Sequence, residues 1–245
     1  MILEVCVDDA AGLAAAAAGG ADRIELCAAL ALGGLTPAAG LIALAARGPL
    51  PVMAMIRPRA GDFVWSAAEV EAMLAEIAAV RAAGLSGVVI GASRPDGTLD
   101  TDTLATLVRA ADGLDITLHR AIDLTPDPIE ALGTCRDLGI RRVLSSGGAR
   151  TAVAGLDRLA LMQASLPGVT IMPGGGVGLA TLPDLAARLT LTEVHASCSR
   201  SLPPPPDPAV AAFGFQPPGA RATDRDTVAA LRRALDQIDG SSTRG

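Results

Sequence analysis

The hydrophobic pattern of the chain alternates between short apolar runs and longer alanine-rich segments. Eight apolar or β-branched runs follow one another, near residues 2–7, 22–27, 51–56, 86–91, 115–120, 141–146, 169–173 and 192–197. Helix-favouring segments separate these runs, and several end at a glycine, which closes a helix without the steric cost of a Cβ. Eight such units in unbroken alternation predict one α/β domain over residues 1–245. We expect a (β/α)8 TIM barrel with parallel strands rather than a doubly wound open sheet.

Polar residues mark the starts of two predicted helices. Ser66 and Glu69 have the spacing of a capping box, in which each side chain satisfies a backbone N–H near the helix start. Asp127 and Glu130 have the same spacing, with Pro128 at the first helical position. Both signatures support the alternation of strands and helices.

The eighth unit departs from this pattern, because residues 199–222 are rich in proline. Proline lacks an N–H and has a restricted φ, so we expect a long irregular loop with neither helix nor inner strand. Phe213 and Phe215, two of the three phenylalanines, lie in it. The segment is either a lid over the barrel mouth or an excursion on the outside. A closing helix is predicted over 224–238, followed by a frayed tail at 241–245.

Charge and hydropathy exclude two classes of partner. The net charge of -6 and the pI of about 4.9 argue against nucleic acid. The mean hydropathy is +0.42, yet charges, glycines or prolines interrupt every apolar run before about 18 residues, so no membrane span is expected. The N-terminus has no basic leader, and four cysteines are too few for a disulfide scaffold. We therefore expect a cytoplasmic protein with free thiols, and we also expect a homo-oligomer.

The residue types that the chain lacks narrow its chemistry. It contains no lysine, tyrosine or asparagine, so all 20 basic residues are arginine. A lysine Schiff base, a tyrosine general acid and a lysine-headed phosphate loop are therefore excluded. Any catalysis must use carboxylates, cysteines, arginines or the two histidines.

The ends of the predicted strands carry polar residues that are candidates for catalysis. The chemistry of a parallel barrel lies on the loops that follow the strands, and both histidines, His119 and His195, lie at such positions. Glu4 and Glu25 point inward from neighbouring strands by alternation. Two close carboxylates would separate in pKa into one acid and one base. These four residues form the candidate catalytic set.

Each of these assignments has a structural alternative. A single histidine is often a hydrogen-bonded structural residue rather than a catalyst. The two carboxylates would equally fit a buried ionic network with Arg57 or Arg120.

Two glycine-rich loops and two arginines predict an anion site. Ser146-Gly147-Gly148 follows the sixth strand and Gly174-Gly175-Gly176 follows the seventh, and each precedes a helix. Backbone N–H groups in such loops bind phosphate or carboxylate. Arg57 and Arg59, at the end of the third strand, would add a charge-assisted fork. The alternative is that glycine only permits tight turns.

Cys6 and Cys27 end neighbouring strands in the same inward phase, with Met55 on the next strand. Thiolate and thioether ligands select Cu(I), so the two cysteines indicate a soft-metal site at the rim. A buried cysteine is otherwise a small apolar filler. The chain has neither a CxxC nor an HxxxH spacing, which argues against structural zinc.

Short motifs at the strand ends follow one another over residues 2 to about 200. They are Leu3–Asp8, Gly19–Cys27, Gly33–Pro37, Met55–Arg59 with Gly61–Phe63, Pro95–Gly97, His119–Asp123, Ser146–Ala149, Pro173–Val177 and His195–Ser197. Together they resemble the CutC family of copper homeostasis proteins. The resemblance implies a (β/α)8 barrel, a cytoplasmic location and Cu(I) as ligand, with the copper-binding pair at Cys6 and Cys27. The proline-rich segment departs from the family's pattern.

Two functions fit this arrangement, and a third is simpler. A copper-binding protein needs only the two cysteines and a methionine. A lyase- or isomerase-type enzyme doing acid–base chemistry on a phosphorylated or carboxylated small molecule needs the carboxylates, Arg57 and both histidines around one cavity. A non-catalytic sensor would bind a metabolite with the same loops. The expected partner is therefore a copper ion or a small anionic metabolite.

Overall fold

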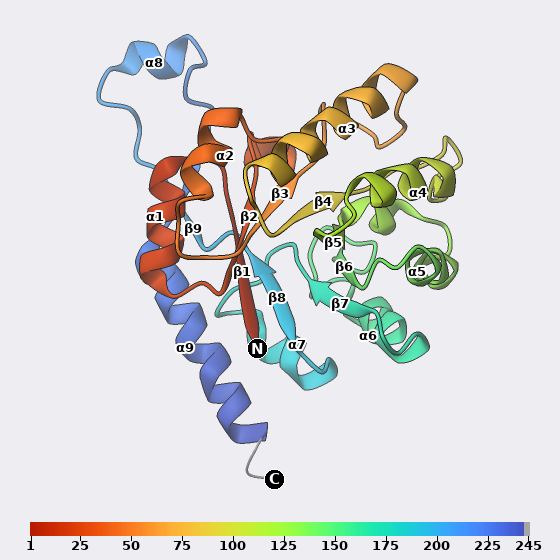
Figure 1. Cartoon of the computed structure of the whole chain (residues 1–245). Coiled ribbons are helices and arrows are strands. Elements are labelled where there is room, and N and C mark those ends of the chain that lie inside the picture. Colours follow the sequence, from red (N-terminus) through yellow and green to blue (C-terminus); the bar gives the residue numbers. More distant parts are fainter. Residues whose placement is uncertain (243–245) are drawn as a thin grey trace.

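Eight parallel strands form the centre of the molecule. The computed structural model describes residues 1–242. The strands are β1 (Ile2–Val7), β2 (Arg23–Leu26), β3 (Val52–Met55), β4 (Gly87–Ile90), β5 (Asp115–Leu118), β6 (Arg142–Ser145), β7 (Thr170–Pro173) and β8 (Glu193–Ala196). Each lies within one of the predicted runs, and helices alternate with them (Figure 1). The predicted α/β fold, a TIM barrel of parallel strands, is confirmed.

The strands follow one another around a nearly closed barrel. Their order is β7-β6-β5-β4-β3-β2-β1-β8, so β1 pairs with both β2 and β8. β7 and β8 lie next to each other, although within residues 1–242 no ladder joins them. Just after β7, a Cβ added at Gly174 would lie 3.4 Å from the Cβ of His195 on β8. The close approach that requires glycine here is to β6, because the same Cβ would lie 2.5 Å from Leu144 Cδ1.

Helices cover the outside of the sheet (Figure 1). They are α1 (Ala10–Gly19), α2 (Ala39–Ala45), α3 (Ala67–Ala82), α4 (Thr101–Ala110), α5 (Pro128–Asp137), α6 (Leu156–Ser165), α7 (Leu182–Arg188) and α9 (Arg225–Ser242), with short 3-10 helices at Leu30–Leu32 and Arg120–Leu124. Both predicted helix starts are confirmed, since Ser66 and Glu69 form a capping box at α3 and Asp127 caps α5. The main apolar core lies between sheet and helices, and a smaller cluster including Met53 and Val89 fills the barrel.

The last helix ties down the start of the chain. α9 begins after Asp224, which caps it, and packs along α1. Arg232 on α9 donates to the Met1 carbonyl and pairs with Asp22 at 2.5 Å. The predicted closing helix is present and spans Arg225–Ser242. Of the frayed tail expected at 241–245, residues 243–245 lie outside the described residues. No helix in the part of the chain described is long and apolar enough to cross a membrane.

The proline-rich segment contains more structure than its composition predicts. β9 (Ser199–Ser201) and β10 (Arg221–Thr223) pair antiparallel, and the short helix α8 (Pro208–Ala212) lies between them. The expectation of a wholly irregular loop is therefore wrong. Pro208 sits in the first turn of α8, where a missing N–H breaks no helical bond, and the hairpin is a separate two-stranded sheet outside the barrel.

The position of this segment favours an excursion over a lid. α8 projects away from the barrel beyond α1 (Figure 1). Among the described residues, those lining the cavity at the barrel mouth include none from 199–222. Phe213 and Phe215 stack on each other, with ring centroids 6.0 Å apart, and are 75% and 79% exposed.

A network of buried charges forms the floor of the barrel. Arg23 at the start of β2 donates to Glu4 on β1 and to Glu193 on β8, both at 2.5 Å. Arg142 at the start of β6 pairs with the same Glu193 oxygen at 2.7 Å and with Asp115 on β5. The ionic network foreseen as an alternative for Glu4 is therefore present, but Arg23 takes the place expected of Arg57 or Arg120.

Substitution of Arg23 tests how much this network contributes to the free energy of unfolding. Arg23→Met would leave Glu4 and Glu193 buried with less compensation, so we expect the free energy of unfolding to fall by about 3–5 kcal/mol. Urea denaturation followed by circular dichroism measures the loss. Arg188→Met removes an exposed pair with Asp157 and should change stability by less than about 0.5 kcal/mol. Equal losses in the two variants would contradict a structural role for the network.

Candidate active site

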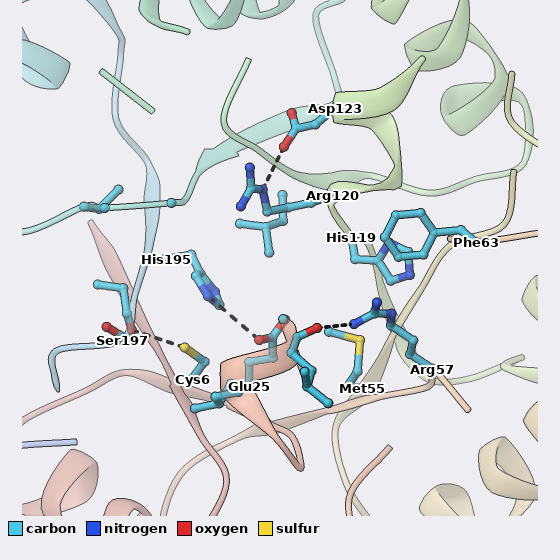
Figure 2. A pocket seen from close by; sticks show the side chains of 18 of the residues that line it. Cys6, Glu25, Met55, Arg57, Phe63, His119, Arg120, Asp123, His195 and Ser197 are labelled. Carbon is cyan, nitrogen blue, oxygen red and sulfur yellow. Dashed lines mark hydrogen bonds and ion pairs between the residues drawn. The ribbon is translucent and has the colours of Figure 1, made fainter. Parts of the chain in front are cut away.

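A cavity of about 600 Å³ opens at the carboxyl ends of the strands. Figure 2 shows the side chains around it. The lining residues that carry charge, sulfur or an aromatic ring are Cys6, Glu25, Met55, Arg57, Phe63, His119, Arg120, Asp123 and His195. Of the predicted catalytic residues, three belong to this wall, and the fourth, Glu4, is buried against His195.

His195 lies between the two predicted catalytic carboxylates. Its Nδ1 is 2.8 Å from Glu4 Oε1, and its Nε2 is 3.8 Å from Glu25 Oε2. Glu25 Oε2 also accepts from the Cys27 thiol at 3.4 Å, whereas its buried Oε1 has no partner within residues 1–242. Strand register explains the contacts, because Glu4 is opposite His195 on β8 and Cys6 is opposite Glu25 on β2.

These three groups differ in their tendency to ionise. Burial disfavours the Glu4 carboxylate, but the hydrogen bond and charge of His195, together with Arg23, lower its pKa to about 2. Burial and the nearby charge of Glu4 raise the pKa of Glu25. Burial also opposes the charged form of His195, yet Glu25, Cys6 and Glu4 raise its pKa well above the usual value. The directions agree with the separation expected for two inward carboxylates.

Arg57 is a buried cation held by carbonyl groups rather than by a carboxylate. Its Nη1 donates to the carbonyls of Leu32 and Gly34, and its Nη2 donates to that of Gly61. Its buried Nε has no partner among the residues described, and burial lowers its pKa. The guanidinium lies 5.1 Å from the ring centre of Phe63. Because no carboxylate in the described chain pairs with it, its charge is available to a ligand.

His119 is held as a neutral hydrogen-bond donor. Its Nδ1 accepts the N–H of Ala121 at 3.1 Å, which assigns the ring proton to Nε2. That buried Nε2 has no partner in the described chain. The ring packs on Gly91 and tilts against Phe63, with centroids 4.6 Å apart. Burial and the charge of Arg57 lower its pKa to about 3, so His119 presents a fixed N–H instead of exchanging protons near neutrality.

The first glycine-rich loop is occupied by a carboxylate of the chain itself. Asp123 accepts the N–H groups of Ser146 and Gly148, at 3.0–3.1 Å, while the Gly147 N–H donates to Ser145 Oγ. An internal anion therefore sits where we expected a ligand. Sequence reasoning missed Asp123, although its place as the next-to-last residue of the short helix after β5 left a carboxylate within reach of the loop.

In the second glycine-rich loop, most backbone N–H groups have no acceptor among the described residues. The Gly174 N–H donates to the Ser145 carbonyl, but those of Gly175, Gly176 and Val177 have no acceptor in the part of the chain described. Gly175 and Gly176 have φ values of +91° and +77°, the left-handed region that favours glycine. These last three residues line the cavity, so this loop retains the capacity to bind an anion.

Arg57 and Arg59, both predicted to bind the anion, lie in different surroundings. Arg59 pairs with Asp62 and Glu69 and stacks over Trp65, outside the cavity wall. The cation that lines the cavity beside the second loop is instead Arg120.

Arg120 is held firmly in that place. Its Nε pairs with Asp123 at 2.8 Å and its Nη2 donates to Ser146 Oγ at 2.5 Å. Its Nη1 lies 3.5 Å from the position of a Cβ added at Gly175. In the sequence, its position directly after His119 at the end of a predicted strand is the feature that could have identified Arg120 as a site residue.

The thiol groups of Cys6 and Cys27 both lie near the carboxylate of Glu25. Cys6 Sγ, a Glu25 oxygen and a His195 nitrogen lie within 4.8 Å of one another, all buried, as a metal site requires. Cys27 lies outside that group, and its thiol donates to Glu25. Burial and the charge of Glu25 raise the pKa of Cys27 well above its usual range. Met55 lines the same cavity.

The depressed pKa of His119 predicts a pH-dependent stability. In the unfolded chain His119 binds a proton below about pH 6.5, whereas in the folded chain it stays neutral until the pH falls to its pKa of about 3. The free energy of unfolding therefore decreases as the pH falls through this window. Between pH 7 and pH 5 the expected contribution is about 2 kcal/mol. His119→Gln should lack it in denaturant titrations at the two pH values, while all other titrating groups are shared. An equal loss in both proteins would contradict the assignment.

Comparison with known proteins places the chain in a family. A model of the CutC family matches residues 1–200. The chain is 52% identical to CutC of Sinorhizobium medicae over 239 residues, 97% of each chain, and 50% identical to CutC of Caulobacter vibrioides over 237 residues, 96% of this chain and 97% of the other. The crystal structure of CutC from Streptococcus agalactiae superposes with a TM-score of 0.76 at 26% identity, covering 80% of this chain and 98% of that one.

More distant structures share the fold alone. N-(5'-phosphoribosyl)anthranilate isomerase from Pyrococcus furiosus has a TM-score of 0.56 at 13% identity, over 96% of this chain and 99% of that one. The family match, the relatives at about half identity and the barrel geometry together lead to one conclusion. This chain belongs to the CutC family.

Proposed function

We propose that the barrel mouth is the active pocket of an enzyme that carries out acid–base chemistry on a small phosphorylated or carboxylated molecule. The observation that carries the proposal is the buried charge of Arg57. Its Nε and the neighbouring His119 Nε2 are two buried donors with no acceptor among residues 1–242. Unpaired buried donors are costly, and an oxygen of an anionic ligand would satisfy both.

The opposite wall supplies groups for proton transfer. Glu25 has a raised pKa and an unpartnered oxygen, which suits a general base, and the protonated His195 3.8 Å away suits a general acid. Glu4 orients His195 through Nδ1 and balances its charge. His119 then acts as a hydrogen-bond donor that orients the substrate. A lyase or an isomerase requires this combination of acid, base and donor.

Solvent-proton exchange tests this function without knowledge of the substrate. A protein-free extract of small molecules is incubated with the protein in D₂O, and mass spectrometry identifies compounds that gain deuterium. We expect at least one anionic compound to gain deuterium with the wild type and with Arg59→Met, and none with Glu25→Gln. If no compound exchanges above the rate without protein, the acid–base proposal fails.

A second function, Cu(I) binding at the barrel mouth, is supported by a different observation. Cys6, Glu25 and His195 bring one sulfur, one oxygen and one nitrogen ligand within 4.8 Å. Thiolate and imidazole are suitable ligands for Cu(I). The Cys27 thiol lies next to this group of ligands, because it donates a hydrogen bond to Glu25. Cys6 and Cys27 are the copper-binding pair that we propose, with His195 as a further ligand. The metal would compete with the thiol protons, so affinity should weaken as the pH falls.

Competition titration with a Cu(I) chelator under reducing conditions tests this second function. We expect Cys6→Ser and Cys27→Ser each to lose at least tenfold in affinity. Cys135→Ser, a buried thiol on α5 away from the cavity, should bind as the wild type does. Equal copper affinity in the wild type and the three cysteine variants would refute the site. Arg57→Met should leave copper affinity unchanged, even if it weakens the binding of an anion.

The proposed setting of the protein follows from the same residues. We propose a cytoplasmic protein, which its four unpaired cysteines support, because reducing conditions keep thiols free. We also propose a homo-oligomer, in which a second copy would cover the exposed pair Phe213 and Phe215.

A further inference from the structure

On the basis of the proposed acid–base pocket, we infer that its ligand has two separate oxygen-bearing ends. Arg57 and His119 receive a planar carbonyl or carboxylate group, and Arg120 with the amides of Gly175–Val177 receives a phosphate. The substrate class is then a phosphorylated compound with an enolisable carbonyl, and the reaction class is isomerisation or epimerisation.

The subsite at Arg57 and His119 offers fewer donors than the subsite at the second glycine-rich loop. Three of the five N–H groups of Arg57 donate to backbone carbonyls, two from Nη1 and one from Nη2, which leaves its Nε–H and one Nη2–H. His119 adds a single N–H from Nε2. Phe63 packs against both side chains and limits their movement. These few donors beside an aromatic face fit one planar oxygen group, and a charge that develops on that oxygen would be stabilised by Arg57.

The subsite at the second glycine-rich loop is richer in donors. Three consecutive residues, Gly175, Gly176 and Val177, offer N–H groups with no acceptor in the described residues. Arg120 lies against Gly175, and its Nη1 is the one guanidinium nitrogen that Asp123, Ser146 and the Ala149 carbonyl leave unengaged within residues 1–242. Several amides with one cation match the many lone pairs of a phosphate.

The proton-transfer groups form a third part of the same wall. Figure 2 shows Arg57 and His119 on one side of the cavity, Arg120 on another, and Glu25 with His195 on a third. Glu25 would take the proton from the carbon next to the carbonyl, as the C–H bond breaks and its electron pair moves to the carbonyl oxygen. Return of the proton to the other face of the same carbon completes an epimerisation. Where that carbon carries a hydroxyl group, return of the proton to the former carbonyl carbon, with transfer of the hydroxyl proton to the former carbonyl oxygen, completes an isomerisation. No other reactant is needed.

Calorimetric titration with three probes tests the two-ended ligand. Inorganic phosphate and glycolate each present one end, and 2-phosphoglycolate presents both, with its carboxylate in place of the enolate. We expect 2-phosphoglycolate to bind at least tenfold more tightly than phosphate, and glycolate to bind most weakly. Arg57→Met and, independently, His119→Ala should remove the gain but keep phosphate binding. Arg120→Met should weaken the binding of phosphate and of 2-phosphoglycolate to the same extent. Arg59→Met, the matched control, should bind all three probes as the wild type does.

The outcomes separate this inference from the proposed function. If 2-phosphoglycolate binds no more tightly than phosphate, or if the gain survives in both Arg57→Met and His119→Ala, the two-ended ligand is wrong while an anion pocket stands. If none of the three probes binds at millimolar concentration to the folded wild type, the anion pocket itself fails. Unfolding curves for each variant distinguish lost binding from lost structure.

Discussion

The buried ion pair between Arg23 and Glu4 connects the charges at the floor of the barrel to those at its mouth. Arg23 helps to keep Glu4 ionised, and the ionised Glu4 in turn stabilises the protonated His195 through Nδ1. The same negative charge makes Glu25 harder to ionise. The floor of the barrel therefore contributes to the protonation of groups at its mouth, beside burial and the contacts among those groups. Such coupling is strong because all of these groups are buried, where charges are weakly screened.

The opposite wall of the cavity has the complementary electrostatics. Arg57 is solvated by backbone carbonyls, so its charge is tolerated in the interior without being neutralised. Arg120 is only partly neutralised, because Asp123 is shared with the amides of the first glycine-rich loop. The wall as a whole presents donors and positive charge, whereas Glu25 and Cys6 present acceptors and sulfur. The donor wall would hold an anionic ligand, whereas Glu25 and His195 belong both to the proposed proton transfer and to the proposed soft-cation site.

The anion-binding role of the two glycine-rich loops shows where sequence reasoning is limited. Both loops have the composition of a phosphate-binding turn, and their residues alone do not distinguish them. Asp123 fills the first loop from a separate segment, and the second loop has no such partner within the described residues. In the proline-rich segment, likewise, the composition excludes an inner strand but does not exclude a hairpin that pairs with itself outside the barrel.

The sequence by itself determined the strand positions, the inward phase of Glu4, Glu25 and the cysteines, and the placement of both histidines at strand ends, because alternation and chain order are local properties. Only the tertiary structure decided the partners. Arg23 opens a strand, so nothing in its surroundings marked it as the counterion of Glu4 until β1, β2 and β8 were aligned. The protonation of His195 and Glu25, the isolation of Arg57 and the neutral state of His119 follow from burial among residues distant in the chain. Burial and charge proximity are properties of three-dimensional packing, which no local pattern contains.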